Sequence, residues 1–287
     1  KTSEIIITTG AKMALSLALQ TILNKGDAII NINPCYPSYN PQILIAELKC
    51  RLINFDLDNE TFEINFNKLD KTIKKYNVKV LLINFPNNPS GKILNKNEIR
   101  KLSSIVYKHK ILLISDEVYD MLNFSNKEII SFGGIKKIQK KVITINSFSK
   151  TYAMTGWRIG YMVAKNNMMN KICKMQQHLI TNVPPFIQFA AISALKQNKD
   201  YLKKYNNDLK YNFDYLKNKF SKNKFIKISP SEGGLFTFVN ISKLKISSDK
   251  FCSELLKKTK VACSPGIYFG KNWDNFVRIS LAANRST

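Results

Sequence analysis

The sequence predicts an α/β fold: a mostly parallel, seven-stranded sheet with helices on both faces, followed by a smaller C-terminal α+β domain. Up to about residue 165, short apolar β-branched runs alternate with helical stretches, the pattern of a parallel sheet covered by helices. Beyond that point longer helices and short, separated strands replace the alternation. We expect a large domain over residues 1–197 and a small C-terminal domain over residues 198–287.

Seven apolar runs are the expected strands of the large sheet. They cover residues 5–9, 28–32, 50–55, 78–85, 111–115, 142–146 and 159–163. Apolar residues at helical spacing predict a helix over residues 15–22, and similar patterns predict helices near 68–76 and over 95–109.

The C-terminal part has its own set of expected elements. Helices are predicted near residues 168–177, 186–195, 200–220 and 249–258. Short strands are predicted over 225–228, 236–240, 261–263 and 277–281.

Composition narrows the class of protein. The net charge of +25 comes mostly from Lys spread along the whole chain between Asn and Ile, so we interpret it as a solvated basic surface. We expect neither a nucleic-acid nor a membrane partner, and no apolar run reaches the roughly 18–20 residues of a spanning helix. The five cysteines are scattered without a CxxC pair, which argues against a disulfide scaffold or a zinc site and fits a reducing cytoplasm.

The first candidate site is the stretch SFSKTYAMTGWRIGY, residues 147–161. Lys150 lies just past the carboxyl end of the strand predicted over 142–146, where open α/β sheets bind ligands. Ser147, Ser149 and Arg158 are near it in sequence, and hydroxyl and guanidinium groups of this kind bind a dianion such as phosphate.

Two loops follow other predicted strands. Gly10, Ala11 and Lys12 lie at a strand-to-helix junction, where backbone N–H groups attract an anion; an ordinary turn is the alternative. The stretch NFPNNPSG, residues 84–91, is a rigid Pro- and Gly-rich loop that presents Asn87 and Asn88, and a turn without a ligand remains open for it.

Two further charged residues lie in or beside apolar strands. Asp116 directly follows the strand predicted over 111–115, with Tyr119 three residues on. Arg278 lies inside the apolar pattern FVRIS, residues 276–280, where its guanidinium suits a carboxylate; an internal salt bridge is the alternative.

Together these groups match the requirements of pyridoxal 5′-phosphate. Its aldehyde reacts with a lysine. A carboxylate keeps its ring nitrogen protonated, so that the ring stabilises a carbanion at the substrate's α-carbon. Its phosphate needs hydroxyls, backbone amides and an arginine.

From residue 5 to residue 282 the sequence resembles the fold-type I pyridoxal-phosphate enzymes, specifically the class I/II aminotransferases of the aspartate aminotransferase-like group. The motifs at residues 147–161 and 84–91 carry the resemblance. It implies that residues 1–197 form the cofactor-binding large domain of that fold, and that the small domain over residues 198–287 is incomplete.

The resemblance also implies roles for individual residues. Lys150 forms the Schiff base with the cofactor, Asp116 pairs with the ring nitrogen, and Asn88 and Tyr119 contact the 3′-oxygen. Tyr36, in the segment Pro34-Cys35-Tyr36-Pro37, stacks on the ring, and Arg278 reads the substrate's α-carboxylate. The implied phosphate ligands are Ala11, Lys12, Ser147, Ser149 and Arg158.

The implied activity is transamination between an L-amino acid and a 2-oxo acid such as 2-oxoglutarate, in a homodimer. Lys12 favours an aspartate-like donor, because in one bacterial branch this position helps to read a side-chain carboxylate. Family members carry a further N-terminal segment before the first strand of this chain, so we expect the sequence to lack it. A carbon–sulfur β-lyase on the same fold and a non-catalytic aminotransferase-like sensor domain remain alternatives.

Overall fold

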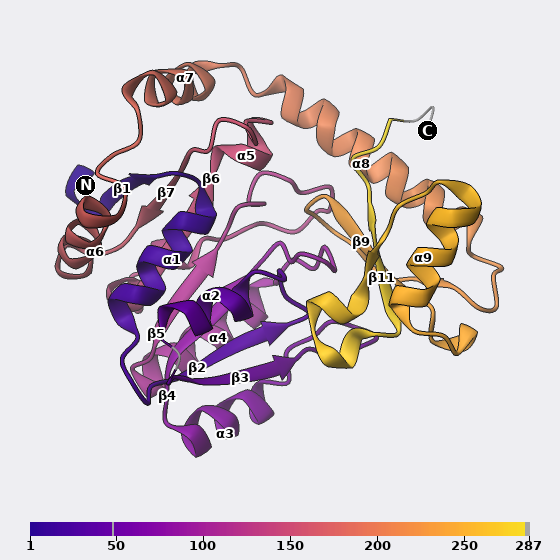
Figure 1. Cartoon of the computed structure of the whole chain (residues 1–287), viewed down its shortest axis with the longest axis horizontal. Coiled ribbons are helices and arrows are strands. Elements are labelled where there is room, and N and C mark those ends of the chain that lie inside the picture. The colour runs from indigo at the N-terminus through magenta and orange to yellow at the C-terminus, as the bar shows by residue number, and fades with distance from the viewer. Residues whose placement is uncertain (48, 285–287) are drawn as a thin grey trace.

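The large sheet has seven strands in the order β1-β7-β6-β5-β4-β2-β3 in the computed structural model, which describes residues 1–47 and 49–284 (Figure 1). Only β7 runs antiparallel to its neighbours β1 and β6, so the prediction of a mostly parallel seven-stranded sheet is confirmed. The strands are β1 (Ile5–Thr8), β2 (Ala28–Asn33), β3 (Arg51–Asp56), β4 (Val78–Asn84), β5 (Leu112–Asp116), β6 (Val142–Ser147) and β7 (Gly160–Val163).

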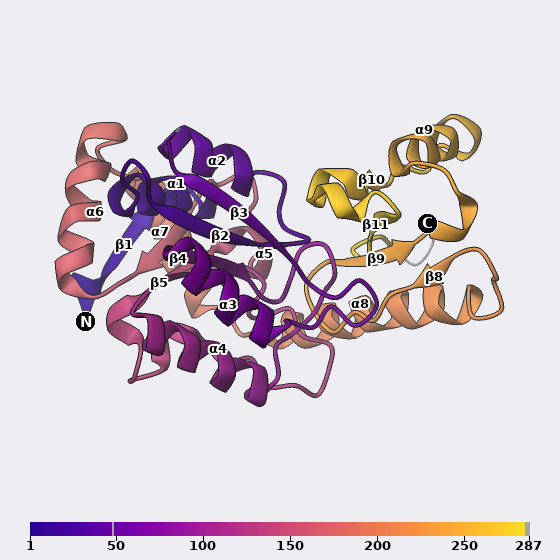
Figure 2. The ribbon, with the colours of Figure 1, turned by 90° about the horizontal axis from the view of Figure 1, so that it is seen from below.

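Helices cover both faces of this sheet, as Figure 2 shows. On one face, α1 (Ala11–Ile22), α2 (Tyr39–Ala46) and α6 (Asn166–Leu179) enclose an apolar core with side chains of the central strands. On the other face, α3 (Phe66–Tyr76) and α4 (Lys96–His109) enclose a second core. Alternate residues of each strand serve the two cores because strand side chains alternate between faces.

The smaller sheet is antiparallel, with the order β10-β11-β9-β8. Its strands are β8 (Lys227–Ile228), β9 (Phe236–Asn240), β10 (Ser264–Pro265) and β11 (Phe276–Ser280), and α9 (Ser248–Thr259) packs beside them. The predicted strand at 261–263 is wrong, because the pairing with β11 begins only at Ser264, opposite Arg278.

Two long helices lead from the large sheet to the small one (Figure 1). They are α7 (Pro185–Lys196) and α8 (Asp200–Lys219). Leu202 of α8 packs on Tyr119 and its neighbours beyond β5, whereas Leu209 and Phe213 pack on Leu281 beyond β11. The predicted domain boundary at residue 197 falls in the short turn between the two helices and stays a prediction.

Two short helices were not predicted from the sequence. The four-residue α5 (Phe148–Thr151) follows β6 directly. In α2, only Tyr39 and Ile43 are buried, while the apolar Leu44 and Ile45 are exposed, so its sequence lacks the apolar stripe that marks an amphipathic helix.

Within the described residues, no helix combines the length and the apolarity needed to cross a bilayer.

Candidate active site

A cavity of about 470 Å³ lies at the carboxyl end of the central strands. All eleven site residues predicted from the sequence line it, although they are spread between residue 11 and residue 278. They are Ala11, Lys12, Tyr36, Asn88, Asp116, Tyr119, Ser147, Ser149, Lys150, Arg158 and Arg278.

The floor of the cavity is formed by the last residues of three adjacent strands. Asn84 ends β4, Asp116 ends β5 and Ser147 ends β6, and all three side chains are buried. Asn84 and Asp116 are partners in the parallel register, and the Asn84 Nδ2 donates to the Asp116 carbonyl at 2.9 Å. Parallel pairing therefore gathers polar groups that are about 30 residues apart in sequence.

Asp116 is a buried carboxylate in a largely neutral setting. Tyr39 Oη donates to its Oδ2 at 2.6 Å, and the Val118 N–H donates to its Oδ1 at 3.2 Å. Burial raises the pKa of Asp116 to about 6, although both hydrogen bonds oppose the rise. None of the ion pairs found among the described residues includes Asp116, so its charge is left for a cationic ligand.

The opposite side of the cavity is suited to an anion. Helix α1 begins at Ala11 after Gly10, whose φ of 85° favours glycine. A Cβ on Gly10 would lie 2.7 Å from Arg158 Nη2, so the glycine lets the guanidinium lie against the helix N-terminus. Ser147 Oγ and Ser149 Oγ lie 2.9 Å apart beside them. An N-terminus, an arginine and two hydroxyls form a site for a phosphate dianion.

Lys150 lines the same cavity and belongs to the short helix α5. Burial lowers the pKa of its ammonium group, and the positive charges of Arg278 and Arg158 lower it further, while Tyr36 opposes the change. A lysine with a lowered pKa has a larger neutral fraction, and the neutral amine is the nucleophilic and basic form.

Arg278 occupies a third side of the cavity. Its Nη1 donates to Asn88 Oδ1 at 3.0 Å and its Nη2 donates to Ser264 Oγ at 2.9 Å. Its Cζ lies 3.9 Å from the centroid of the Phe236 ring and 5.0 Å from that of Phe269. No acidic side chain pairs with it among the described residues, so the internal salt bridge that the sequence left open is not formed, and the guanidinium is available to a carboxylate.

Sequence reasoning missed several residues of the cavity, chiefly Tyr39, Asn84 and Phe236. Tyr39 lies two residues past the segment Pro34-Cys35-Tyr36-Pro37, and Asn84 opens the NFPNNPSG stretch, so both were next to a signal. Asn87, singled out with Asn88, instead braces the loop: its amide nitrogen donates to Pro34 O at 3.1 Å.

The comparison with known protein families gives a clear result. The model of the family described as Aminotransferase class I and II matches residues 1–287. The chain belongs to this family. An aspartate aminotransferase of Pyrococcus horikoshii is 35% identical over 98% of this chain and 72% of its own length. A probable aspartate aminotransferase of Methanocaldococcus jannaschii is 32% identical over 97% of this chain and 73% of its own length.

Solved structures agree with the sequence relatives. The aspartate aminotransferase of Thermotoga maritima superposes with a TM-score of 0.90 at 29% identity, covering 100% of this chain and 73% of that one. An aromatic aminotransferase of Pyrococcus horikoshii reaches 0.92 at 29% identity, covering 98% and 75%. The predictions of this fold, of pyridoxal phosphate as cofactor and of transamination as activity are therefore confirmed.

Proposed function

We propose that this aminotransferase transfers the amino group of an aspartate-like L-amino acid to a 2-oxo acid such as 2-oxoglutarate, and that the cavity around Lys150 is its active site. The proposal rests on one observation. An anion-binding region, a buried carboxylate without an ion-pair partner and an arginine without an acidic partner line one cavity together with the Lys150 amine.

Asp116 is the residue that would hold the ring nitrogen of pyridoxal phosphate. When bound, this cofactor withdraws electrons from the substrate's α-carbon, most strongly with its ring nitrogen protonated. The Asp116 carboxylate favours the protonated nitrogen by charge attraction. Tyr39 stabilises the ionised carboxylate by donating its hydroxyl hydrogen at 2.6 Å.

Three more residues would orient the ring. Asn88 Oδ1 already accepts from Arg278, so its amide nitrogen is the group left to donate to the ring's 3′-oxygen. Burial, and next the negative charge of Asp116, raise the pKa of the Tyr119 hydroxyl, which keeps it a hydrogen-bond donor to the same oxygen. Tyr36 offers its ring for stacking, and Lys12 Nζ lies 5.7 Å from the centroid of that ring.

The phosphate would bind at the N-terminus of α1. The backbone N–H groups of Ala11 and Lys12 lie in the first turn of α1. The N–H groups of a first turn have no hydrogen-bond partner within the helix, so they can donate to a ligand. The hydroxyls of Ser147 and Ser149 and the guanidinium of Arg158 complete the set. The Arg158 charge, the helix N-terminus and the hydroxyl donors together suit a phosphate dianion.

Lys150 would act as the base. Its lowered pKa increases the fraction that is neutral near pH 7, and Nζ in that form removes the proton from the substrate's α-carbon. Arg278 would hold the α-carboxylate through its forked guanidinium, which aligns the α-carbon with Lys150.

The choice of an aspartate-like donor rests on Lys12. Its side chain is exposed at the cavity rim and carries a positive charge suited to a second carboxylate. One relative named above acts on aspartate by its name and another on aromatic amino acids. Overall similarity therefore does not decide the donor, and Lys12 is the residue that supports an aspartate-like one.

We also propose a homodimer in the cytoplasm, without a nucleic-acid or membrane partner, and large and small domains divided at residue 197. Phe186, Phe189, Ile192 and Leu195 of α7 are exposed to between 45% and 69%. A run of exposed apolar side chains on one helix supports a protein contact.

The absorption spectrum of the cofactor-loaded protein tests the proposal. We expect a visible band that bleaches on addition of aspartate and returns with 2-oxoglutarate, and no such band in Lys150→Ala, which loses at least about 10⁴-fold in activity because base and anchor disappear together. A band silent to both compounds would refute the aspartate-like donor and favour another amino donor, the lyase or the sensor. The same band in Lys150→Ala would refute the role of Lys150.

A further inference from the structure

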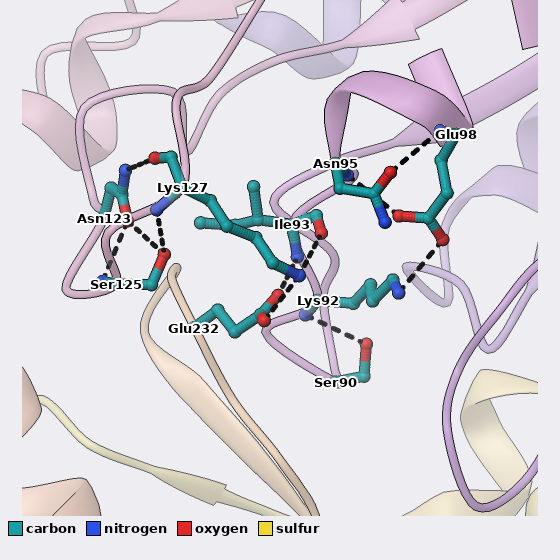
Figure 3. A network of polar contacts seen from close by, with 9 residues as sticks. All are labelled: Ser90, Lys92, Ile93, Asn95, Glu98, Asn123, Ser125, Lys127 and Glu232. Atoms are coloured by element: carbon teal, nitrogen blue, oxygen red, sulfur yellow. Dashed lines mark hydrogen bonds and ion pairs between the residues drawn. The ribbon is translucent and has the colours of Figure 1, made fainter. Parts of the chain in front are cut away.

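Glu232 lies outside the cavity, in the segment that connects β8 to β9. Its carboxylate Oε1 lies 2.6 Å from Lys127 Nζ, and its Oε2 accepts from the Ile93 N–H at 3.0 Å. Lys127 Nζ also donates to the Ile93 carbonyl at 3.3 Å. Figure 3 shows both side chains converging on the main chain of Ile93. We call Glu232, Lys127 and the Ile93 main chain the Glu232 clamp.

The clamp joins three segments that are far apart in sequence. Lys127 belongs to a turn after β5, whose Ser125 and Asn123 side chains are hydrogen-bonded to each other. The amide of Asn123 donates to the Lys127 carbonyl at 2.7 Å (Figure 3). The lysine is therefore presented from a braced turn rather than from a free loop.

Main-chain hydrogen bonds reinforce the same junction. The Glu232 and Gly233 N–H groups both donate to the Gly91 carbonyl at 3.0 Å, and the Gly234 N–H donates to the Leu122 carbonyl at 2.8 Å. A Cβ on Gly91 would collide with the side chain of Ser231 and lie 2.8 Å from the Gly233 carbonyl. The small-sheet segment is thus in close contact with the loop after β4.

Both segments that meet at this junction, the loop after β4 and the segment before β9, carry a residue that contacts Arg278. On one side, the loop after β4 carries Asn88, whose Oδ1 accepts from Arg278. On the other side, the clamped segment runs into β9, where the Phe236 ring lies 3.9 Å from the Arg278 Cζ. Leu235, between the clamp and Phe236, accepts from the Leu281 N–H beyond β11, the strand of Arg278.

A nearby ion pair fixes the other end of the loop after β4. Lys92 Nζ lies 3.0 Å from Glu98 Oε1, and both side chains are less than 10% exposed. The second oxygen of Glu98 accepts from the Asn95 N–H at 2.8 Å, at the start of α4 (Figure 3). Lys92 and Ile93 are adjacent, so the loop is anchored to α4 by one residue and to Glu232 by the next.

We propose that Glu232 is a positioning residue for substrate recognition: through the clamp it sets Arg278 and Phe236 relative to Asn88 and Lys150. The inference rests on the proposed role of Arg278 as the group that binds the substrate carboxylate. Glu232 does not line the cavity, so it acts through Arg278 and not on the substrate.

The Glu232 clamp is better suited to positioning Arg278 and Phe236 than to stabilising the fold. The side chains of Lys127 and Glu232 are 32% and 25% exposed, and partly exposed ion pairs contribute little to folding. A shift of about 1 Å in a substrate-binding group nevertheless lowers catalytic efficiency by up to about 10²-fold.

Asp27 offers a matched control. Its Oδ2 also takes one lysine ammonium at 2.6 Å, from Lys79, and one backbone N–H, from Asn24 at 2.7 Å. The two side chains are 36% and 22% exposed, close to the values of the clamp. Asp27 is not among the residues of the cavity, so Asp27→Ala removes the same kind of interaction at a site without contact to Arg278.

The test measures KM and kcat of the holoenzyme for aspartate and 2-oxoglutarate. In Glu232→Ala we expect KM to rise about tenfold for both substrates, because both carry the carboxylate that Arg278 binds, with kcat changed by less than about threefold. Glu232→Gln keeps an oxygen that accepts from Ile93 and loses only the charge, so it restores part of the affinity. Asp27→Ala leaves both KM values unchanged.

A binding measurement separates positioning from activity. Succinate carries carboxylates but no amino or oxo group, so calorimetric titration of the holoenzyme reports on carboxylate binding alone. We expect its affinity to fall about tenfold in Glu232→Ala and in Lys127→Met, while the absorption spectrum of the bound cofactor stays as in the wild type.

Arg278→Leu distinguishes the two ways in which the idea fails. If Arg278→Leu raises KM while Glu232→Ala behaves like Asp27→Ala, the clamp has no positioning role and the inference is wrong. If Arg278→Leu leaves KM and succinate affinity unchanged, the proposed function of Arg278 is wrong and the inference falls with it.

Discussion

The interiors and the ends of strands β4, β5 and β6 are equally buried and chemically opposite. Leu82, Ile114 and Ile143 lie inside these strands and are 0% exposed. Asn84, Asp116 and Ser147 end the same strands, are at most 7% exposed, and are all polar. Within two to four residues the sheet therefore changes from a core that stabilises the fold to a floor that binds ligands.

The difference has an energetic side. Burying an apolar side chain such as Ile143 contributes about 1.5–3 kcal/mol to folding. Burying an ionisable group without a charged partner costs free energy, and the raised pKa of Asp116 is the measure of that cost. The apolar interiors of the strands stabilise the folded protein with or without a ligand. Burial of the polar strand ends becomes favourable only when a ligand is bound to them.

Asp116→Asn changes the ligand-binding floor most strongly, so we expect it to have the largest effect on catalysis. The substitution keeps the shape and a hydrogen-bond partner for Tyr39 but removes the charge that favours a protonated ring nitrogen. We expect kcat to fall on the order of 10²–10³-fold, the range seen when a preorganised electrostatic group is lost. Steady-state kinetics with saturating cofactor measures the effect, and an unchanged kcat would contradict the assigned role.

Asp116→Asn is expected to lower kcat but to raise the stability of the cofactor-free protein above about pH 6. In the cofactor-free protein the folded carboxyl keeps its proton up to about pH 6, whereas the usual value is 3.8, so the folded state binds more protons between these values. The free energy of unfolding therefore falls by about 2–3 kcal/mol as the pH rises through this window. Chemical denaturation from pH 3.5 to 8 shows this fall in the wild type. We expect it to be smaller by about this amount in Asp116→Asn, where Glu117 and Asp120 still contribute because burial raises their pKa values too.

Ile143→Ala tests the other half of the comparison. Removing a fully buried side chain from the core between the sheet and α1 is expected to lower the free energy of unfolding by about 2–5 kcal/mol. Ile143→Val removes one methylene and costs about 1 kcal/mol. Because neither variant alters the floor of the cavity, kcat of the folded enzyme should match the wild type. A large loss of kcat in Ile143→Val would contradict the division into core and floor.

Sequence patterns predicted the interiors and the ends of these strands for different reasons. Interiors such as residues 142–145 are continuous β-branched runs, and their short length and β-branched side chains favour a buried strand over a helix. The ends were found because polar residues follow those runs directly. The boundary was off by one residue for Asp116, which is the last residue of β5 rather than the first after it.

Other parts could not be predicted because their structure depends on distant contacts. Strand β10 has two residues and exists only through its pairing with β11. The contact between Tyr39 and Asp116 spans 77 residues, and α2, which carries Tyr39, has no apolar stripe. Glu232 and Lys127 likewise look like ordinary solvated charges in the sequence, and only the fold brings them to Ile93.

Tyr39→Phe is the mildest test, because it removes a single hydroxyl beneath the floor of the cavity. The Tyr39 hydroxyl donates to the ionised form of Asp116 and so holds the pKa of that carboxyl below the value burial alone would give. Its loss is expected to cost about 0.5–1.5 kcal/mol and to raise that pKa further. In the cofactor-free protein, the fall of stability with pH should therefore extend to higher pH than in the wild type.

The double variant Tyr39→Phe/Asp116→Asn decides whether the effect passes through Asp116. If it does, the extension of the pH-dependent fall that Tyr39→Phe causes disappears once the carboxyl is replaced, because the acid to which the hydroxyl donates no longer titrates. If the extension persists in the double variant, Tyr39 acts on another buried acid near the end of β5, such as Glu117 or Asp120, whose pKa values burial also raises. The first result would make the hydroxyl part of the floor that tunes Asp116; the second would assign it to the packing beneath.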